Sequence, residues 1–216
     1  MTRALRTGSG PAAPWVPVVV ACAALCACGP PVGTNPPAAG VARVSVVPTA
    51  TSVQAGLTLD SASFELDQLF VFGDVLPHPG DGSMPVHASI NAIAGGTVQS
   101  GVELSFTTLQ QGLYSTVRFA VERVRITGTY QGRPLTISLA DPRPFPVAPL
   151  TITPPKELGP GKDVTFTVHF DVGSWFAGNV LANCQPATGP ISIDGMRNGM
   201  VGGQILRNLG GGFGIQ

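Results

Sequence analysis

Charged residues are scarce in this sequence, at 11% of its 216 positions, whereas about a quarter of the residues are charged in a typical soluble domain. The 12 basic and 12 acidic residues balance to a formal net charge of zero, and they form no basic stripe. Nucleic-acid binding depends on such a positive surface. We therefore expect no nucleic-acid partner.

Motifs of catalysis and of metal binding are also missing. The sequence has no Gly-x-Ser-x-Gly nucleophile elbow, no phosphate-binding loop and no His-x-His or His-Glu-x-x-His spacing. Its three histidines, His78, His87 and His169, are far apart in the chain, and we interpret them as surface residues. The sequence thus predicts no catalytic residue, no metal site of the zinc type and no cofactor.

Carboxylates leave one enzymatic alternative open. Glu65 with Asp67, or Asp171 with Asp194, could converge in a hydrolase, because glycosidases work with two carboxyl groups. Nothing in the sequence selects either pair.

A calcium site is a second alternative, since hard cations take oxygen ligands. Asp74 and Asp81 flank a short loop, and Asn179, Asn183 and Asp194 follow the Trp175 region. The sequence contains no EF-hand loop, so we assign no metal site from it.

The first 27 residues have the three parts of a signal peptide. Arg3 and Arg6 provide a positive start, and an apolar run follows from about Val16 to Ala27. A membrane-spanning helix needs about 20 apolar residues, so this run is too short and suits the apolar region of a signal peptide. Residues 1–27 are therefore predicted to be a signal peptide.

The end of this segment resembles the processing site of bacterial lipoproteins. Leu25 lies three positions before Cys28, and Ala27 lies directly before it. The resemblance implies that the Cys28 thiol is acylated and becomes the new N-terminus. Cys22 is an alternative site, because Val19-Val20-Ala21 precedes it. We favour Cys28, since the apolar run ends there. A cleaved signal peptide without lipid is the other alternative.

The same resemblance predicts a location and a partner. In lipoproteins, an Asp directly after the acylated cysteine is the main signal that retains the protein at the inner membrane. Here the residue after Cys28 is Gly29. We expect an outer-membrane lipoprotein of the cell envelope, facing the periplasm or the surface. Its first partner is then the membrane itself, through the lipid anchor.

Cleavage before Cys28 would leave Cys184 as the second cysteine of the mature chain. No intramolecular disulfide is then expected, although the compartment is oxidising. No basic residue stands near Cys184 in the sequence, so nothing indicates a reactive thiolate. We expect a half-buried thiol, with pairing between molecules as the alternative.

Glycine and proline are abundant, at 28 and 21 residues. They dominate residues 28–40, which we predict to be a tether that separates the acylated cysteine from the domain. From residue 41 to 216 the chain has the short alternating segments of β-strands, separated by turns. Strands are predicted at residues 41–47, 61–72 with a bulge at 67–68, 85–93, 102–109, 114–130, 134–139 and 164–171.

Period-two alternation also predicts which side chains are buried. The predicted inward set is Val117, Phe119 and Val121 on one strand, and Val164, Phe166, Val168 and Phe170 on another. Strands of this length and spacing predict an all-β fold, an antiparallel β-sandwich of immunoglobulin-like or transthyretin-like type.

The C-terminal region has a different pattern. Apolar residues at loosely helical spacing predict a short helix near residues 195–209: Met196, Met200, Ile205, Leu206 and Leu209. Asp194 is the expected N-cap. After the helix, Phe213 and Ile215 either form an edge strand or belong to a loose C-terminal tail.

Two motifs resemble a family of bacterial lipoprotein domains of unknown function. A Gly and a Tyr open the long strand at Gly112-Leu113-Tyr114, and a threonine-rich strand runs into Asp171-Val172-Gly173-Ser174-Trp175-Phe176. The resemblance implies a lipoprotein with a sandwich domain. It carries no catalytic residues to this chain.

Aromatic side chains are the remaining candidates for ligand contact. Trp175, Tyr114 and Tyr130 could stack on a sugar ring, whereas Trp175 could instead close one end of the sandwich. The sequence therefore predicts a non-catalytic, membrane-anchored envelope lipoprotein with a binding or structural role and an unknown protein or glycan partner. A carbohydrate-binding module and a periplasmic hydrolase with an unrecognised site are the alternatives.

Overall fold

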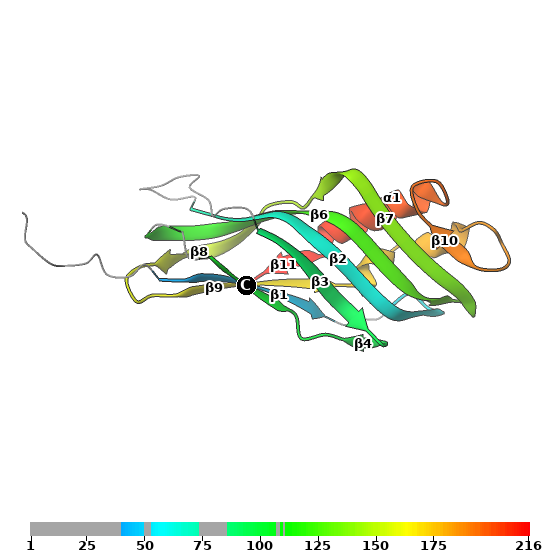
Figure 1. The fold of residues 1–216 in the computed structure, drawn as a ribbon, viewed down its shortest axis with the longest axis horizontal. Helices are drawn as coiled ribbons and strands as arrows, with labels where there is room; N and C mark the ends of the chain where they lie inside the picture. Colours follow the sequence, from blue (N-terminus) through cyan, green and yellow to red (C-terminus); the bar gives the residue numbers. More distant parts are fainter. Residues whose placement is uncertain (1–39, 50–52, 74–85, 107–108, 110) are drawn as a thin grey trace, which may run out of the picture. The chain divides into compact units, whose positions relative to one another are not determined.

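The computed structural model describes residues 40–49, 53–73, 86–106, 109 and 111–216 (Figure 1). The predicted signal peptide, the acylation of Cys28 and nearly all of the tether lie outside the described residues. The same is true of Asp74, His78 and Asp81.

Two β-sheets pack together in a sandwich-like arrangement (Figure 1). The first has the strand order β11 (Phe213–Ile215), β9 (Val164–Asp171), β1 (Ala42–Thr49) and β5 (Val102–Phe106). The second has the order β10 (Ile191–Ile193), β7 (Arg133–Pro146), β6 (Gly112–Tyr130), β2 (Leu57–Phe72), β3 (Val86–Ala94) and β4 (Thr97–Val98), with β8 (Leu150–Leu158) paired to β6. Two short 3-10 helices, η1 (Gly173–Phe176) and η2 (Val180–Asn183), and one helix, α1 (Gly199–Gly211), follow β9.

The predicted inward-facing residues are buried between the sheets. All seven are at most 5% exposed, and their alternation continues along β1, where every second residue is buried. In a pleated strand successive side chains point to opposite faces, so one face of each strand meets the core. The predicted β-sandwich with a short C-terminal helix is confirmed.

Two strand pairs are parallel, so the sheets are mixed and not wholly antiparallel. β1 pairs with β9 in parallel across residues 42–49 and 164–171, and β10 pairs with β7 in parallel. Antiparallel pairs can be joined by a tight turn, whereas a parallel pair needs a long connection. Here most of the second sheet intervenes between β1 and β9 in the sequence. Alternation within a strand cannot show which distant strand lies beside it.

The predicted bulge at residues 67–68 is present, and β6 has a register shift and a tight turn of its own. Gln68 has a positive φ of 52°, and the register of β2 shifts at this point against both β3 and β6. The register of β6 against β7 shifts between Val121 and Arg123. Gln131 and Gly132 both have positive φ and join β6 to β7, as a two-residue hairpin of the primed type requires.

Five aromatic rings join the two sheets to η1. Phe64 of β2 contacts Phe170 of β9 edge to face, at 5.0 Å between ring centroids. Trp175 of η1 stacks on Phe170 at 6.0 Å, and Phe213 of β11 lies 4.9 Å from Phe119 of β6. Trp175 is fully buried. The interpretation of Trp175 as a structural residue at the end of the sandwich therefore fits its position.

The C-terminal helix begins later than predicted and is not capped by Asp194. The α1 helix spans Gly199–Gly211, and Asn198 is its N-cap residue. Asp194 instead accepts hydrogen bonds from the backbone N–H groups of Met196 and Arg197, which closes a tight turn before the helix. Phe213 and Ile215 form the predicted edge strand beside β9.

Met196 and Met200 do not belong to the buried face of the helix region. They are 97% and 91% exposed, whereas Val201, Ile205 and Leu209 are buried. These three recur every four residues, so they share one side of the helix. The helix starts at Gly199, later than the predicted residue 195, so Met196 lies before it and Met200 lies on its exposed side.

Candidate functional site

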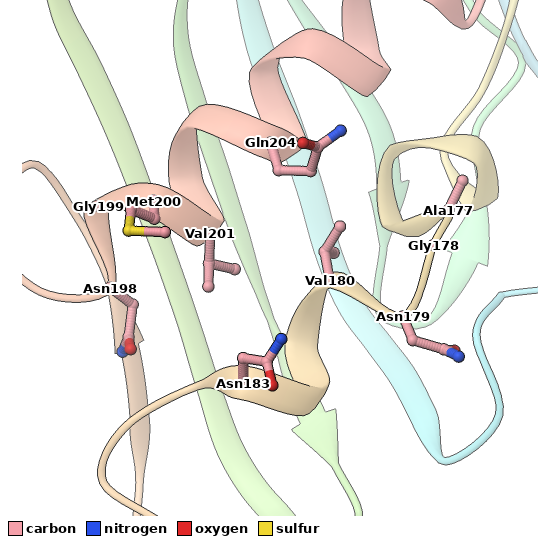
Figure 2. A pocket seen from close by; sticks show the side chains of 10 residues that line it. All are labelled: Ala177, Gly178, Asn179, Val180, Asn183, Asn198, Gly199, Met200, Val201 and Gln204. Carbon is pink, nitrogen blue, oxygen red and sulfur yellow. The ribbon is translucent and has the colours of Figure 1, made fainter.

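A pocket of about 520 Å³ lies between the two 3-10 helices and the first half of α1 (Figure 2). Residues 177–180 and Asn183 line one side, and residues 198–201 and Gln204 line the other. Small-molecule and peptide sites are commonly concave hollows of about 300–1,000 Å³ with an apolar surface and a few polar groups. The size of this pocket falls within that range.

The pocket combines two apolar side chains with uncharged amides. Val180 and Val201 are 8% and 9% exposed, and Figure 2 shows Gln204 above Val180 and Asn183 below it. None of the ten lining residues carries a charge. Carboxamides both donate and accept hydrogen bonds. The pocket therefore suits a neutral ligand that has an apolar part and its own donors and acceptors.

Two asparagines fix the walls of the pocket to their surroundings. The Asn198 Oδ1 accepts a hydrogen bond from the Gln185 N–H at 2.7 Å, and its Nδ2 donates to the carbonyls of Gln185 and Ser192. The Asn208 Nδ2 donates to the carbonyls of Trp175 and Ala177. Because both residues bridge α1 to segments before it, the helix is held against η1 and against the loop that follows η2.

Sequence reasoning missed both asparagines. A signal for Asn198 was present, because an Asn directly before a helical segment is a common N-cap. Asn208 had no such signal, since its partners are backbone carbonyls more than 30 residues away.

Replacing Asn198 by Gly should lower the free energy of unfolding by about 1–3 kcal/mol, because three hydrogen bonds to the backbone are lost at a partly buried site. Gly tolerates the positive φ of 53° at this position. The decrease in unfolding free energy therefore measures the contribution of the Asn198 side chain and not backbone strain. Asn179→Gly is a matched control. Asn179 also has a positive φ and precedes a helical turn, but it makes no side-chain cap. Urea denaturation measures both, and equal losses would contradict the assignment.

The three aromatic side chains predicted to stack on a ligand are all in the core. Trp175 is 0% exposed, Tyr114 is 2% exposed and Tyr130 is 5% exposed. The ring of Trp175 packs on Phe170, and the hydroxyl of Tyr130 accepts a hydrogen bond from the Gln54 amide. The stacking prediction is therefore corrected, because no ring face of the three is open to a ligand.

His87 and His169, the two histidines in the described part of the chain, lie on strands of different sheets. His87 is exposed, as predicted, and its Nδ1 lies 2.7 Å from Oδ1 of the buried Asp67. His169 is partly buried on β9, with its Nε2 enclosed and without a hydrogen-bond partner among the described residues. Within that same part of the chain, no three His, Cys, Asp or Glu side chains gather as a metal site would need.

The carboxylates of the two hydrolase pairs each have a partner of their own. Glu65 pairs with Arg123 at 2.7 Å, and Asp67 pairs with His87. Asp171 accepts a hydrogen bond from the Gly173 N–H. Asp194 holds its tight turn, and the backbone N–H groups of Arg197 and Met196 lower its pKa. The structure shows these groups in local structural roles.

Of the residues considered for calcium, Asp74 and Asp81 lie outside the described residues, and the other three do not gather in one site. Asn179 and Asn183 line the pocket, whereas Asp194 lies outside it in the turn before α1. A hard cation would need several oxygen ligands, normally including carboxylates, and the pocket lining offers only uncharged groups.

Cys184 is more buried than the sequence suggested. It is 5% exposed, and burial raises the pKa of its thiol, with Arg133 acting weakly in the opposite direction. A raised pKa keeps the thiol protonated, so it is a poor nucleophile. Pairing between molecules would first require this region to open.

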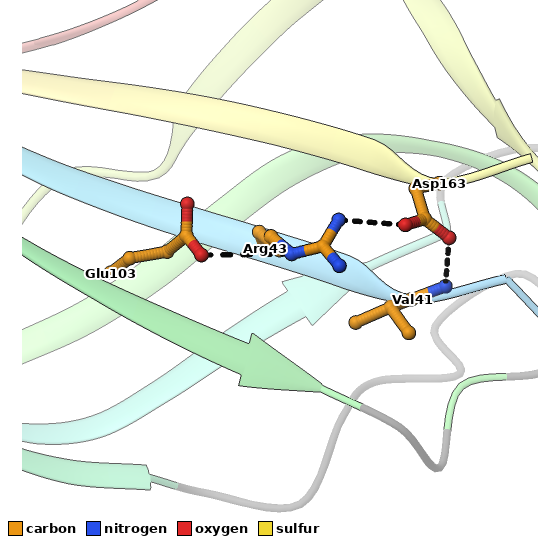
Figure 3. Close-up of polar contacts among 4 residues, drawn as sticks. All are labelled: Val41, Arg43, Glu103 and Asp163. Carbon is orange, nitrogen blue, oxygen red and sulfur yellow. Dashed lines mark hydrogen bonds and ion pairs between the residues drawn. The ribbon is translucent and has the colours of Figure 1, made fainter.

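A cluster of polar contacts fixes the start of the domain (Figure 3). The Val41 N–H donates to Asp163 Oδ1 at 2.8 Å, and the Arg43 guanidinium donates to Asp163 Oδ2 at 2.7 Å. Glu103 lies 3.6 Å from the other side of Arg43. One residue earlier, the Gly40 N–H donates to the Gly159 carbonyl, and a Cβ at Gly40 would collide with the Lys162 carbonyl. The chain therefore enters the domain at a fixed point beside the start of β9.

Acid should weaken this cluster. The hydrogen bonds from Val41 and Arg43 hold the pKa of Asp163 below its ordinary value, so the unfolded state binds this proton more readily than the folded state. The stabilisation is present above the ordinary aspartate pKa and is lost as the pH falls through the lowered value. Unfolding free energies measured from about pH 6 to about pH 2 should fall less steeply in Asp163→Asn than in the wild type. Equal slopes of the unfolding free energy against pH in the two proteins would contradict this role of Asp163.

No helix in the described part of the chain is both long and apolar enough to cross a membrane. Comparison of the chain with protein-family models, with curated proteins and with solved structures finds no significant match.

Proposed function

We propose that this protein is a non-catalytic lipoprotein of the cell envelope, which holds a β-sandwich domain on a tether of residues 28–40 and presents it for binding. The anchor in this proposal is an acyl group on Cys28, and the proposed location is the outer membrane. The lipoprotein-like sequence around Cys28 supports this anchor.

One structural observation supports presentation most strongly. The chain enters the domain at Gly40, beside Gly159 and Lys162 and before the start of β9. The pocket is lined by residues 177–180, which follow the other end of β9. The eight residues of β9 span about 26 Å at about 3.3 Å per residue. In this proposal the tether joins the domain about one strand length away from the pocket, so the attachment point does not block the pocket.

The character of the pocket supports a role in binding without catalysis. General acid–base catalysis uses positioned titratable groups, and the lining of this pocket has none. Anchoring on a flexible stem also raises the effective concentration of a binding domain near partners in the same compartment.

Detergent phase partition tests the proposal. The mature wild-type protein should enter the detergent phase, because acyl chains carry roughly 0.8 kcal/mol of transfer free energy per buried CH₂ group. A chain that begins at Pro37, without the acylated cysteine, should remain in the aqueous phase. Wild-type protein that remains in the aqueous phase would contradict the proposed anchor.

A further inference from the structure

We infer that the pocket between η2 and α1 is a binding site for a short, uncharged segment of a polypeptide that inserts one apolar side chain. This inference deepens the binding role proposed above and names the class of partner. The lipid anchor takes no part in it.

The floor of the pocket is apolar. Val180 and Val201 come from opposite walls and are both nearly buried at the base of an open hollow (Figure 2). An aliphatic side chain placed between them would remove further apolar surface from water, which stabilises binding by about 25 cal/mol per Å². Charged side chains would gain nothing comparable, because no lining residue offers an opposite charge.

Uncharged amides lie beside this apolar floor. The side chain of Asn183 has no hydrogen-bond partner among the described residues, whereas the Gln204 amide is held by Asn208 and Arg207. The Asn179 side chain points away from Val180 (Figure 2). An Asn side chain offers two donors and one acceptor, which matches the alternating N–H and C=O groups of an extended peptide backbone. A neutral backbone can therefore be satisfied beside the apolar floor.

The rim of the pocket favours a peptide over a saccharide. Met200 is 91% exposed at the pocket rim. Exposed methionines are frequent on surfaces that bind varied polypeptides, because the flexible thioether adapts to different side chains. Saccharides favour the faces of aromatic rings, and no aromatic residue lines this pocket.

Titration of the purified full-length chain with a capped pentapeptide, acetyl-Gly-Ser-Leu-Ser-Gly-amide, tests the inference. The side-chain amide resonances of Asn183 should shift in nuclear magnetic resonance spectra. Peptides with Gly, Glu or Lys in place of the central Leu should bind at least about tenfold more weakly, because they lose the apolar contact. Equal affinities for peptides with Leu, Gly, Glu or Lys at the central position would overturn the inference.

Variants at two exposed methionines separate the pocket from its surroundings. Met200→Ser and Asn183→Ala should each weaken binding by roughly three- to tenfold, whereas Met196→Ser should leave it unchanged. Both methionines are almost fully exposed, so neither change should impair folding. Equal effects of Met200→Ser and Met196→Ser would overturn the inference.

A neutral disaccharide serves as the competing probe. If maltose or di-N-acetylchitobiose shifts the same amide resonances and the Leu peptide does not, the site is not a peptide site. No response to the Leu peptide at a few millimolar would also overturn the inference. These results do not depend on acylation, so they are distinct from failure of the detergent partition experiment.

Discussion

Replacing Phe170 by Ala should lower the free energy of unfolding by about 3–5 kcal/mol. Phe170 is 1% exposed on β9, and its ring contacts Phe64, Trp175 and Phe213. These partners come from β2, η1 and β11, so the substitution leaves a cavity where both sheets and η1 meet. Chemical denaturation of the purified protein, followed by circular dichroism, measures the loss.

A matched substitution gives the control for this prediction. Phe70 of β2 alternates with the buried Leu69 and Val71 and is only half-buried, with Phe72 as its ring neighbour. Phe70→Ala should cost about 1 kcal/mol or less, as is usual for substitutions outside the core. If the two variants lose equal unfolding free energy, the placement of the Phe170 ring in the core between the sheets is wrong.

Replacing Cys28 by Ala should release the protein from the membrane fraction. The thiol of Cys28 is the proposed acylation site, and Ala has no group that can take its place. Unprocessed precursor should accumulate, since lipoprotein processing as implied by the resemblance follows acylation. Membrane flotation and an immunoblot for precursor and mature sizes measure the two effects.

Cys22→Ala is the matched control for the anchor. Cys22 also follows a short apolar segment, Val19-Val20-Ala21, and it would be removed with the signal peptide if processing occurs at Cys28. This variant should partition with the membrane as the wild type does. If Cys22→Ala releases the protein and Cys28→Ala does not, the anchor is at Cys22.

Much of the fold was predictable because strands and helices leave local patterns in the sequence. Strict alternation at 164–171 identified β9, and the break in alternation at Asp67 and Gln68 identified a bulge. The turn at Gln131 and Gly132 was also predictable, because few residues adopt positive φ at two successive positions. These features depend on neighbouring residues alone.

The pairing of β1 with β9 was not predictable in the same way. Their parallel register joins residues more than 100 positions apart, and nothing in either strand identifies the other. The late start of α1 had a different cause. Apolar methionines suggested a buried face, although both are exposed, since a turn closed by Asp194 occupies the predicted first turn of the helix.

The candidate site was the least predictable part. Its lining combines two separate segments, 177–183 and 198–204, and uses Asn, Gln, Val and Met, none of which forms a recognised motif. Aromatic residues were chosen from the sequence because they can stack on ligands, but the same large apolar surface favours their burial. Trp175, Tyr114 and Tyr130 are accordingly in the core.

The intact mass of the mature protein extracted from membranes tests the lipid anchor most directly. We predict the mass of residues 28–216 increased by acyl groups, and fragmentation should place the whole increase on Cys28. An unmodified mass, or a mature N-terminus at any other residue, would contradict the proposal that this domain is presented from the membrane by an acylated Cys28.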